Sequence, residues 1–389
     1  MKHLSRSLLL ALVHFSCATL VIPAPHGIYG VDVTEMVLTD TSRLDPFAPH
    51  PVNRSVVVSA FYPVAVRSEC DWKQIPYMSE QAAAVMDKNI GFTVPEGTFK
   101  SFRMQVCSPK RRQSHAKHRS WSKTGSPLVL LSPGNSGSRL EYSLIAQAVA
   151  SQGYTVVAID HPYDARFVVF PDGEVVEAII FLPDPGVPEQ LEMIELFFET
   201  RVSDARFVLD ELEKPDVVHH LFPNTPLDCG LDTEHVAMIG HSAGGVTAMI
   251  VSSKDNRFVG ALNMDGGLAG VKGFLQDGTD VPVLLFESEH PQPDWPKIWP
   301  HLSDWKLWLR LEKSEHPTFT DYPYLVHLLG MDPVSSEIAA SIGEIPGDRV
   351  MEIISTYVGA FLDLVLHGRH GKLLEGPSEA FSEVEYLRG

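Results

Sequence analysis

From Pro127 onward, short apolar segments alternate with turns and helical stretches, and this alternation limits the fold more than any other feature. An amphipathic helix is predicted from about Leu140, and a long final helix over about 349–366. Strands that alternate with helices run parallel to one another, so the rhythm predicts a mostly parallel sheet flanked by helices. The predicted strands are residues 128–131, 155–159, 235–239, 259–264, 281–286 and 305–311.

Two segments ahead of this region, residues 33–39 and 54–64, are rich in β-branched and aromatic residues. A stretch that contains Pro and Asp separates them, which predicts an N-terminal antiparallel pair of strands. No internal repeat and no long biased linker divides the remainder of the chain. We therefore expect residues 19–389 to form a single α/β domain.

Residues 162–195 interrupt the alternation, because prolines are scattered among large apolar side chains there. We interpret this segment as an excursion over the sheet. In an enzyme it would form part of a substrate-binding cap, and the alternative is a structural loop with its own small hydrophobic cluster. The prolines that define it are Pro171, Pro183, Pro185 and Pro188.

The charge balance excludes one class of partner. The formal net charge is -18, and nucleic-acid binding depends on Lys and Arg to neutralise phosphates, so no nucleic-acid partner is expected. A basic stretch at residues 108–123 runs against this trend. We expect it to be a surface insertion; the alternatives are a processing site or a contact with an anionic interface.

The N-terminus has the pattern of a secretory signal peptide. Basic residues precede an apolar run over residues 8–22, and the small residues at 16–18 offer a cleavage site. A membrane anchor is the alternative, but the run is shorter than the roughly 20 residues of a spanning helix, and His14 and Ser16 interrupt it. We predict a signal peptide over residues 1–18 and a secreted protein.

Two further features fit an extracellular route. Asn53 begins an Asn-Arg-Ser glycosylation sequon. Removal of the leader leaves Cys70, Cys107 and Cys229, for which one disulfide and one free thiol is the simplest arrangement. We expect Cys70 to pair with Cys107, because these two cysteines flank one segment ahead of the predicted core.

Residues 240–245 read Gly-His-Ser-Ala-Gly-Gly and match the G-x-S-x-G pattern. They lie between the predicted strand 235–239 and a helical run that begins near Gly245. A serine on such a tight turn has strained backbone angles and an exposed hydroxyl, and its glycines avoid collisions with neighbouring backbone. This context predicts the nucleophile Ser242 of an α/β-hydrolase fold.

A serine nucleophile needs a base and a carboxylate, which follow it in the order Ser, acid, His in this fold. Asp265 directly follows the strand 259–264, whereas Glu287 and Glu289 lie at the end of the next strand. Either position reaches the carboxyl edge of the sheet. From the residues alone, all three remain candidates for the acid.

His316 is the predicted base, because it follows the strand 305–311 and begins a turn that could bring it to the serine. The other downstream histidines are expected to be surface or packing residues. These are His290, His301 and His327.

The oxyanion hole should combine the backbone N–H of Ala243 with a second N–H from the turn at residues 132–137, for which Asn135 is the best candidate. A plain polar turn is the alternative interpretation of these residues. Asp160 and His161, which end another strand, either line the pocket or form a buried structural pair.

The sequence contains no metal-binding or nucleotide-binding motif that would favour another function over a serine hydrolase. Neither His219 with His220 nor His115 with His118 has further ligands at useful spacing, and a phosphate-binding loop that ends in Lys-Ser or Lys-Thr is missing from the sequence. No cofactor and no metal are implied.

Between residues 132 and 316, the chain resembles the platelet-activating-factor acetylhydrolase family of secreted lipases and esterases. The resemblance implies that Asp265 is the acid, and that the substrates are phospholipids with short or oxidised acyl chains, hydrolysed without calcium. Peripheral contact with lipid surfaces would follow. The matching blocks are residues 132–135, 236–242, 257–258 and 261–265, and His316 with Phe319 and Asp321.

The sequence also departs from that family. Pro133 stands where the animal enzymes carry His, and Ala243 stands where they carry a bulkier aromatic residue, which would reshape the acyl pocket. Two alternatives stay open. One is an esterase or lactonase that acts on another small metabolite, and the other is a catalytically silent binding protein on the same fold.

Overall fold

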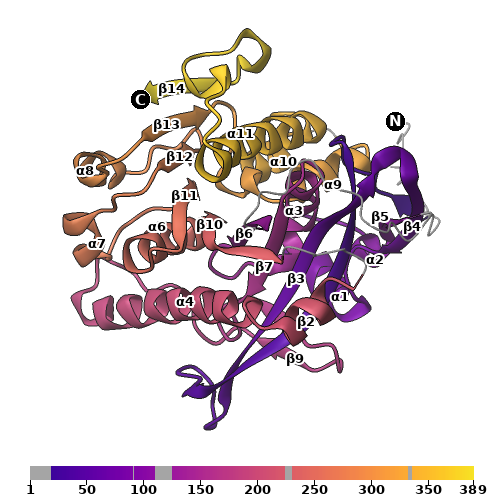
Figure 1. Cartoon of the computed structure of the whole chain (residues 1–389), viewed down its shortest axis with the longest axis horizontal. Coiled ribbons are helices and arrows are strands. Elements are labelled where there is room, and N and C mark those ends of the chain that lie inside the picture. The colour runs from indigo at the N-terminus through magenta and orange to yellow at the C-terminus, as the bar shows by residue number, and fades with distance from the viewer. Residues whose placement is uncertain (1–18, 91, 110–124, 224–229, 332–334) are drawn as a thin grey trace, which may run out of the picture.

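The computed structural model of the chain describes residues 19–90, 92–109, 125–223, 230–331 and 335–389 (Figure 1). The predicted leader, Cys229 and nearly all of the basic stretch at 108–123 lie outside the described residues. Asn53 is described and exposed at the start of a strand, where its side chain is accessible to solvent.

Within the described residues, nine strands form the central sheet in the order β14-β13-β12-β11-β10-β6-β7-β3-β2. Neighbours from β7 to β13 pair in parallel, whereas β2, β3 and β14 are antiparallel to their neighbours. The predicted α/β-hydrolase fold with its N-terminal antiparallel pair is therefore confirmed. The strands are β2 (Tyr29–Leu44), β3 (Asn53–Val66), β6 (Ser126–Ser132), β7 (Thr155–Asp160), β10 (Leu231–His241), β11 (Phe258–Met264), β12 (Val283–Glu287), β13 (Lys306–Leu311) and β14 (Val384–Arg388).

Two helical layers cover the sheet, one on each face (Figure 1). Strand side chains alternate between the faces: Val129 and Leu131 enter one core, whereas Leu128 and Leu130 enter the other. Because both faces are buried, the inner strands consist largely of apolar residues, such as residues 128–131 of β6 and 236–239 of β10. The first layer contains α3 (Ser143–Ala150), α9 (Tyr322–Leu328), α10 (Ser336–Ile342) and α11 (Gly347–His367); the second contains α4 (Leu191–Leu212), α5 (Pro215–Leu221), α6 (Ala243–Lys254), α7 (Lys272–Asp277) and α8 (Trp295–Ile298).

A small separate sheet packs beside the N-terminal strands. It consists of β1 (Leu20–Val21), β5 (Phe102–Pro109) and β4 (Cys70–Pro76), and the helices α1 (Glu80–Asn89) and α2 (Thr98–Ser101) lie between β4 and β5 in the sequence. A disulfide joins Cys70 to Cys107 across this sheet, which is the pair expected from the sequence. Gly30 makes room for it, because a side chain there would collide with the sulfur of Cys70.

The predicted excursion at 162–195 has two parts. The hairpin of β8 (Phe167–Val169) and β9 (Val175–Glu177) packs on β3 in a small cluster with Val57. The stretch that follows carries Ile179 and Phe181, whose exposed fractions are 52% and 63%. One half is therefore a structural loop, and the other half presents apolar side chains to solvent. The helix α4 begins at Leu191, inside the segment that the sequence assigned to the excursion.

Replacement of both Cys70 and Cys107 by alanine should lower the free energy of unfolding by about 2–4 kcal/mol, because the disulfide closes a loop with a sequence separation of 37. Urea unfolding followed by circular dichroism measures this difference. A midpoint equal to that of the wild-type chain would contradict a stabilising role for the crosslink.

Candidate active site

The parallel strands bring four of the predicted site segments to one edge of the sheet. Ser132 at the end of β6 is in register with Gly240, and Met264 at the end of β11 is in register with both His241 and Phe286. Because the carboxyl ends of parallel strands share an edge, Ser242 and Asp265 emerge side by side as the next residues along their strands.

Ser242 occupies a strained turn between β10 and α6. Its φ and ψ are 55° and -126°, a region that residues other than glycine seldom adopt. Its N–H donates to the carbonyl oxygen of Met264 at 2.8 Å, and this bond helps to hold the turn. Side chains at Gly240 or Gly244 would collide with neighbouring backbone. The glycines of the motif therefore allow the tight turn that leaves the Ser242 side chain partly exposed.

His316 Nδ1 lies 2.6 Å from Asp265 Oδ2. The Asp265 carboxylate is 1% exposed, and its other oxygen accepts hydrogen bonds from Ser288 N at 2.9 Å and Gln292 Nε2 at 3.0 Å. A buried carboxylate with three partners is fixed in position and in turn orients the imidazole. The His316 side chain is 47% exposed, so its ring can be reached from solvent.

The other carboxylates that the sequence offered have different partners. Glu287 is fully buried but pairs with Arg310 at 2.7 Å, and its second oxygen accepts from Gln292 N at 3.3 Å. Glu289 accepts from the backbone N–H of Lys313 at 2.7 Å. Of the three candidates, Asp265 is the one whose carboxylate contacts the imidazole of His316.

The remaining histidine candidates also lie in other contacts. His290 pairs with Glu315 at 3.0 Å, and His327 Nδ1 lies 3.6 Å from Asp348. His301 is exposed at the end of a short 3-10 helix, where its carbonyl oxygen accepts from Thr279 N. These three histidines are surface residues, as the sequence predicted.

The turn at residues 132–137 passes directly beside the serine. A side chain at Gly134 would come within 3.2 Å of Ser242 Cβ, so this turn and the turn that carries Ser242 are in contact. The N–H of Gly134 donates to the hydroxyl of Tyr142 at 3.1 Å and is already engaged. The side-chain oxygen of Asn135 accepts from Leu182 N at 3.2 Å, which joins the turn to the excursion.

Ser242, Asp265 and His316 all lie within the region that a family model matches. The model describes "Platelet-activating factor acetylhydrolase, isoform II" and matches residues 209–363. The chain is also 29% identical to "Probable 1-alkyl-2-acetylglycerophosphocholine esterase" of Arthroderma benhamiae, over 95% of this chain and 94% of that protein. The chain is therefore similar to platelet-activating factor acetylhydrolases, and it is a carboxylic ester hydrolase.

Two further matches show how much of the chain is similar to other esterases. The acetylhydrolase-like chain is 26% identical to the platelet-activating factor acetylhydrolase of Cavia porcellus, over 68% of this chain, and spans only 64% of that protein. The solved ferulic acid esterase from Streptomyces cinnamoneus aligns with a TM-score of 0.74 and 28% identity, over 95% of this chain and 100% of that one. The scaffold is thus shared with esterases whose named substrates differ.

Several residues around this acetylhydrolase-like site carry no sequence signal. Gln292 reaches Asp265 from the loop after β12, and Tyr142 places its hydroxyl 2.8 Å from His241 Nδ1. Asp160 and His161 are both buried: Asp160 pairs with Arg139, and His161 Nδ1 lies 2.9 Å from Asp204 Oδ2, so of the two predicted alternatives the buried structural role is the one observed. Among the described residues, no group of three His, Cys, Asp or Glu side chains could hold a metal ion.

His241 lies against the predicted base, with 4.5 Å between the ring centroids of His241 and His316. Burial, and then the neighbouring His316, lower the pKa of His241 well below its ordinary value. His241 therefore stays neutral near pH 7. A neutral neighbour leaves His316 free to accept a proton without a second positive charge beside it.

The free energy of unfolding should fall as the pH drops through about 6.5, because His241 binds a proton in the unfolded chain but not in the folded one. Between pH 7.5 and 5.5, this residue should account for about 1.4 kcal/mol of the loss. Urea unfolding at the two pH values measures it, and His241→Gln should reduce the difference. The exposed His220, replaced in the same way, is the control; an unchanged difference in His241→Gln would contradict the assignment.

Proposed function

We propose that the chain is a serine esterase in which Ser242, His316 and Asp265 act together. The observation that carries this proposal is the contact between His316 Nδ1 and Asp265 Oδ2 at 2.6 Å, next to a serine held on a strained turn. The carboxylate fixes the tautomer of the imidazole and stabilises its charged form, and the imidazole Nε2 is left to take the serine proton.

In the proposed reaction, Ser242 Oγ attacks the ester carbonyl carbon while His316 accepts the hydroxyl proton. The carbonyl oxygen becomes an oxyanion, which the N–H groups of Ala243 and Asn135 stabilise. Collapse of this intermediate breaks the ester C–O bond, and His316 gives its proton to the departing alcohol. Water, deprotonated by His316, then attacks the acyl-enzyme and releases the carboxylic acid and Ser242.

We propose phospholipids with short or oxidised acyl chains as the substrate class. The names of the fungal and guinea-pig relatives support this choice. The exposed apolar side chains Ile179 and Phe181 support contact with a lipid surface beside the site. The leader pattern at 1–18, the Asn53 sequon and the disulfide support a secreted glycoprotein.

A second candidate is an esterase or lactonase for a small metabolite. The likeness to a ferulic acid esterase over 95% of this chain favours it, as does the small side chain of Ala243 beside the nucleophile. The two candidates share one mechanism and differ in the group that fills the acyl pocket. Substrate preference, rather than the presence of activity, therefore separates them.

The wild-type chain should react covalently with a fluorophosphonate probe and hydrolyse p-nitrophenyl acetate, and Ser242→Ala should abolish the labelling and nearly all of the hydrolysis. Gel fluorescence and release of p-nitrophenol measure the two properties. The folded wild-type chain would be a binding protein if it neither reacted with the probe nor hydrolysed any ester. A panel of short-chain phosphatidylcholines, feruloyl esters and lactones ranks the substrates by kcat/KM.

Asp265→Asn should lower kcat by about three to four orders of magnitude, because the amide cannot stabilise the imidazolium and favours the wrong tautomer. Glu289→Gln is the matched control, since it neutralises the carboxylate of a rejected candidate near the same edge. Steady-state kinetics on p-nitrophenyl acetate compare the two variants. An Asp265→Asn enzyme with wild-type kcat would remove this carboxylate from the mechanism.

A further inference from the structure

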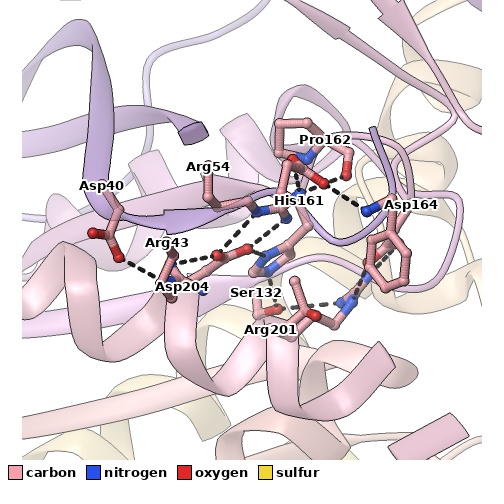
Figure 2. A network of polar contacts seen from close by, with 12 residues as sticks. Asp40, Arg43, Arg54, Ser132, His161, Pro162, Asp164, Arg201 and Asp204 are labelled. Atoms are coloured by element: carbon pink, nitrogen blue, oxygen red, sulfur yellow. Dashed lines mark hydrogen bonds and ion pairs between the residues drawn. The ribbon is translucent and has the colours of Figure 1, made fainter. Parts of the chain in front are cut away.

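A buried arginine from α4 contacts the turn that passes beside Ser242. Figure 2 shows Arg201 next to Ser132 and Asp164. Its side chain is 1% exposed, and its guanidinium donates to the carbonyl oxygen of Pro133 at 2.6 Å and to that of Gly134 at 3.0 Å. Two successive carbonyl oxygens of the turn are therefore held by one planar, charged group. Bonds to charged donors are stronger than neutral ones, so this contact restrains the turn more than an ordinary side-chain bond would.

The guanidinium is itself fixed in place. Asp164 pairs with Arg201 through two bonds, from Nε at 2.5 Å and from Nη2 at 2.6 Å, and the ring of Phe197 lies 4.9 Å from the guanidinium carbon. This two-pronged geometry uses one edge of the guanidinium and leaves the remaining donors for the turn. A lysine at this position has a single ammonium group and cannot reproduce both sets of contacts.

The Gly134 carbonyl and the Asn135 N–H belong to one peptide group. In a planar trans peptide they point in opposite directions, so a donor that fixes the carbonyl also fixes the direction of the N–H. Arg201 binds the carbonyl of Gly134, whereas the Cα of Gly134 faces Ser242 Cβ. Gly137 N also donates to that carbonyl, at 3.0 Å, so the peptide is held by two donors.

We propose that Arg201 is the positioning residue of the oxyanion turn, which sets the Asn135 N–H toward the carbonyl oxygen of the substrate. This proposal rests on the proposed esterase function and names a residue that acts through the turn rather than on the substrate. An oxyanion hole accelerates a reaction only when its donors are oriented in advance. The Arg201 and Asp164 pair supplies that orientation from behind the turn.

A second residue of α4, Asp204, lies about one helical turn after Arg201 and supports Ser132, the first residue of the turn at 132–137. Asp204 Oδ2 lies 2.9 Å from His161 Nδ1, and His161 Nε2 lies 3.0 Å from Ser132 Oγ (Figure 2). Although burial alone would raise it, the Arg54 guanidinium holds the pKa of Asp204 below its ordinary value, so this carboxylate stays ionised. Ser132, His161 and Asp204 are thus linked in the order of the serine, histidine and aspartate of a catalytic triad. Ser132 is fully buried, however, and cannot contact a substrate.

The spacing of the two α4 residues explains how one helix performs both tasks. Positions three apart lie on the same side of a helix, so Arg201 and Asp204 both face the turn. Arg201 holds the carbonyl oxygens of Pro133 and Gly134, and Asp204 acts through His161 on the preceding serine. Arg201 and Asp204 together therefore fix three consecutive residues, 132–134, against α4.

Two variants test the proposal. Arg201→Lys keeps the positive charge but loses the planar guanidinium with its several donors. The double variant Arg201→Met with Asp164→Asn removes both charges, so that no unpaired carboxylate stays buried. In each folded variant, kcat on p-nitrophenyl acetate should fall about 10- to 100-fold while KM changes less than about twofold. The inhibition constant of a trifluoromethyl ketone, whose adduct with the serine carries an oxyanion, should rise by the same factor.

Arg206→Lys is the matched control, because Arg206 lies on the same helix but forms an exposed ion pair with Asp255. It should keep the wild-type kcat and inhibition constant. Thermal melting identifies the folded variants, and all assays are run well below the melting temperature. Either Arg201 variant, folded and with kcat within twofold of wild type, would overturn the proposal. A wild-type chain that neither labels nor hydrolyses esters would instead refute the esterase function.

Discussion

The first turn of α6 packs so closely on the ends of β6 and β11 that its glycines leave no room for side chains. A Cβ atom at Gly244 would collide with the carbonyl oxygen of Ser132, and one at Gly245 would collide with the side chain of Asn263. This contact sets the distance between the turn at Ser242 and the turn at residues 132–137. The strain at Ser242 persists because the surrounding strands and helix over-determine it.

Buried charges hold the loops around this contact. Arg139 pairs with Asp160, and Arg54 pairs with both Asp45 and Asp204, all with little or no exposure to solvent. Such pairs contribute little net stability, since desolvation offsets their attraction, but breaking one leaves an uncompensated buried charge. We infer that their main effect here is on geometry, because they fix the ends of β6 and β7 relative to α4.

Much of the fold could be predicted, because its strands are buried on both faces and read as continuous apolar runs. The edge strand β14 and the helix α4 were missed. The former is short and partly exposed, and the latter begins within a proline-rich segment whose pattern resembles a loop. Both elements depend on tertiary contacts for their stability, and these contacts cannot be predicted from the local sequence.

The site was only partly predictable, for a related reason. Strand ends indicated where Ser242 and its candidate partners would lie, but three carboxylates fitted the same edge. Arg310 neutralises Glu287, and a partner from a different strand cannot be read from spacing. Arg201 and Gly134 are separated by 67 positions along the chain, so nothing near either residue signals the contact.

The hydrogen bond from Leu182 N to the side chain of Asn135 joins two regions that usually evolve at different rates. Surface excursions accept insertions and deletions readily, whereas turns that support chemistry do not. Here a change of loop length near Leu182 would be transmitted to the backbone beside Ser242. The length of this surface segment and the conformation of the turn at residues 132–137 are therefore coupled through the side chain of Asn135.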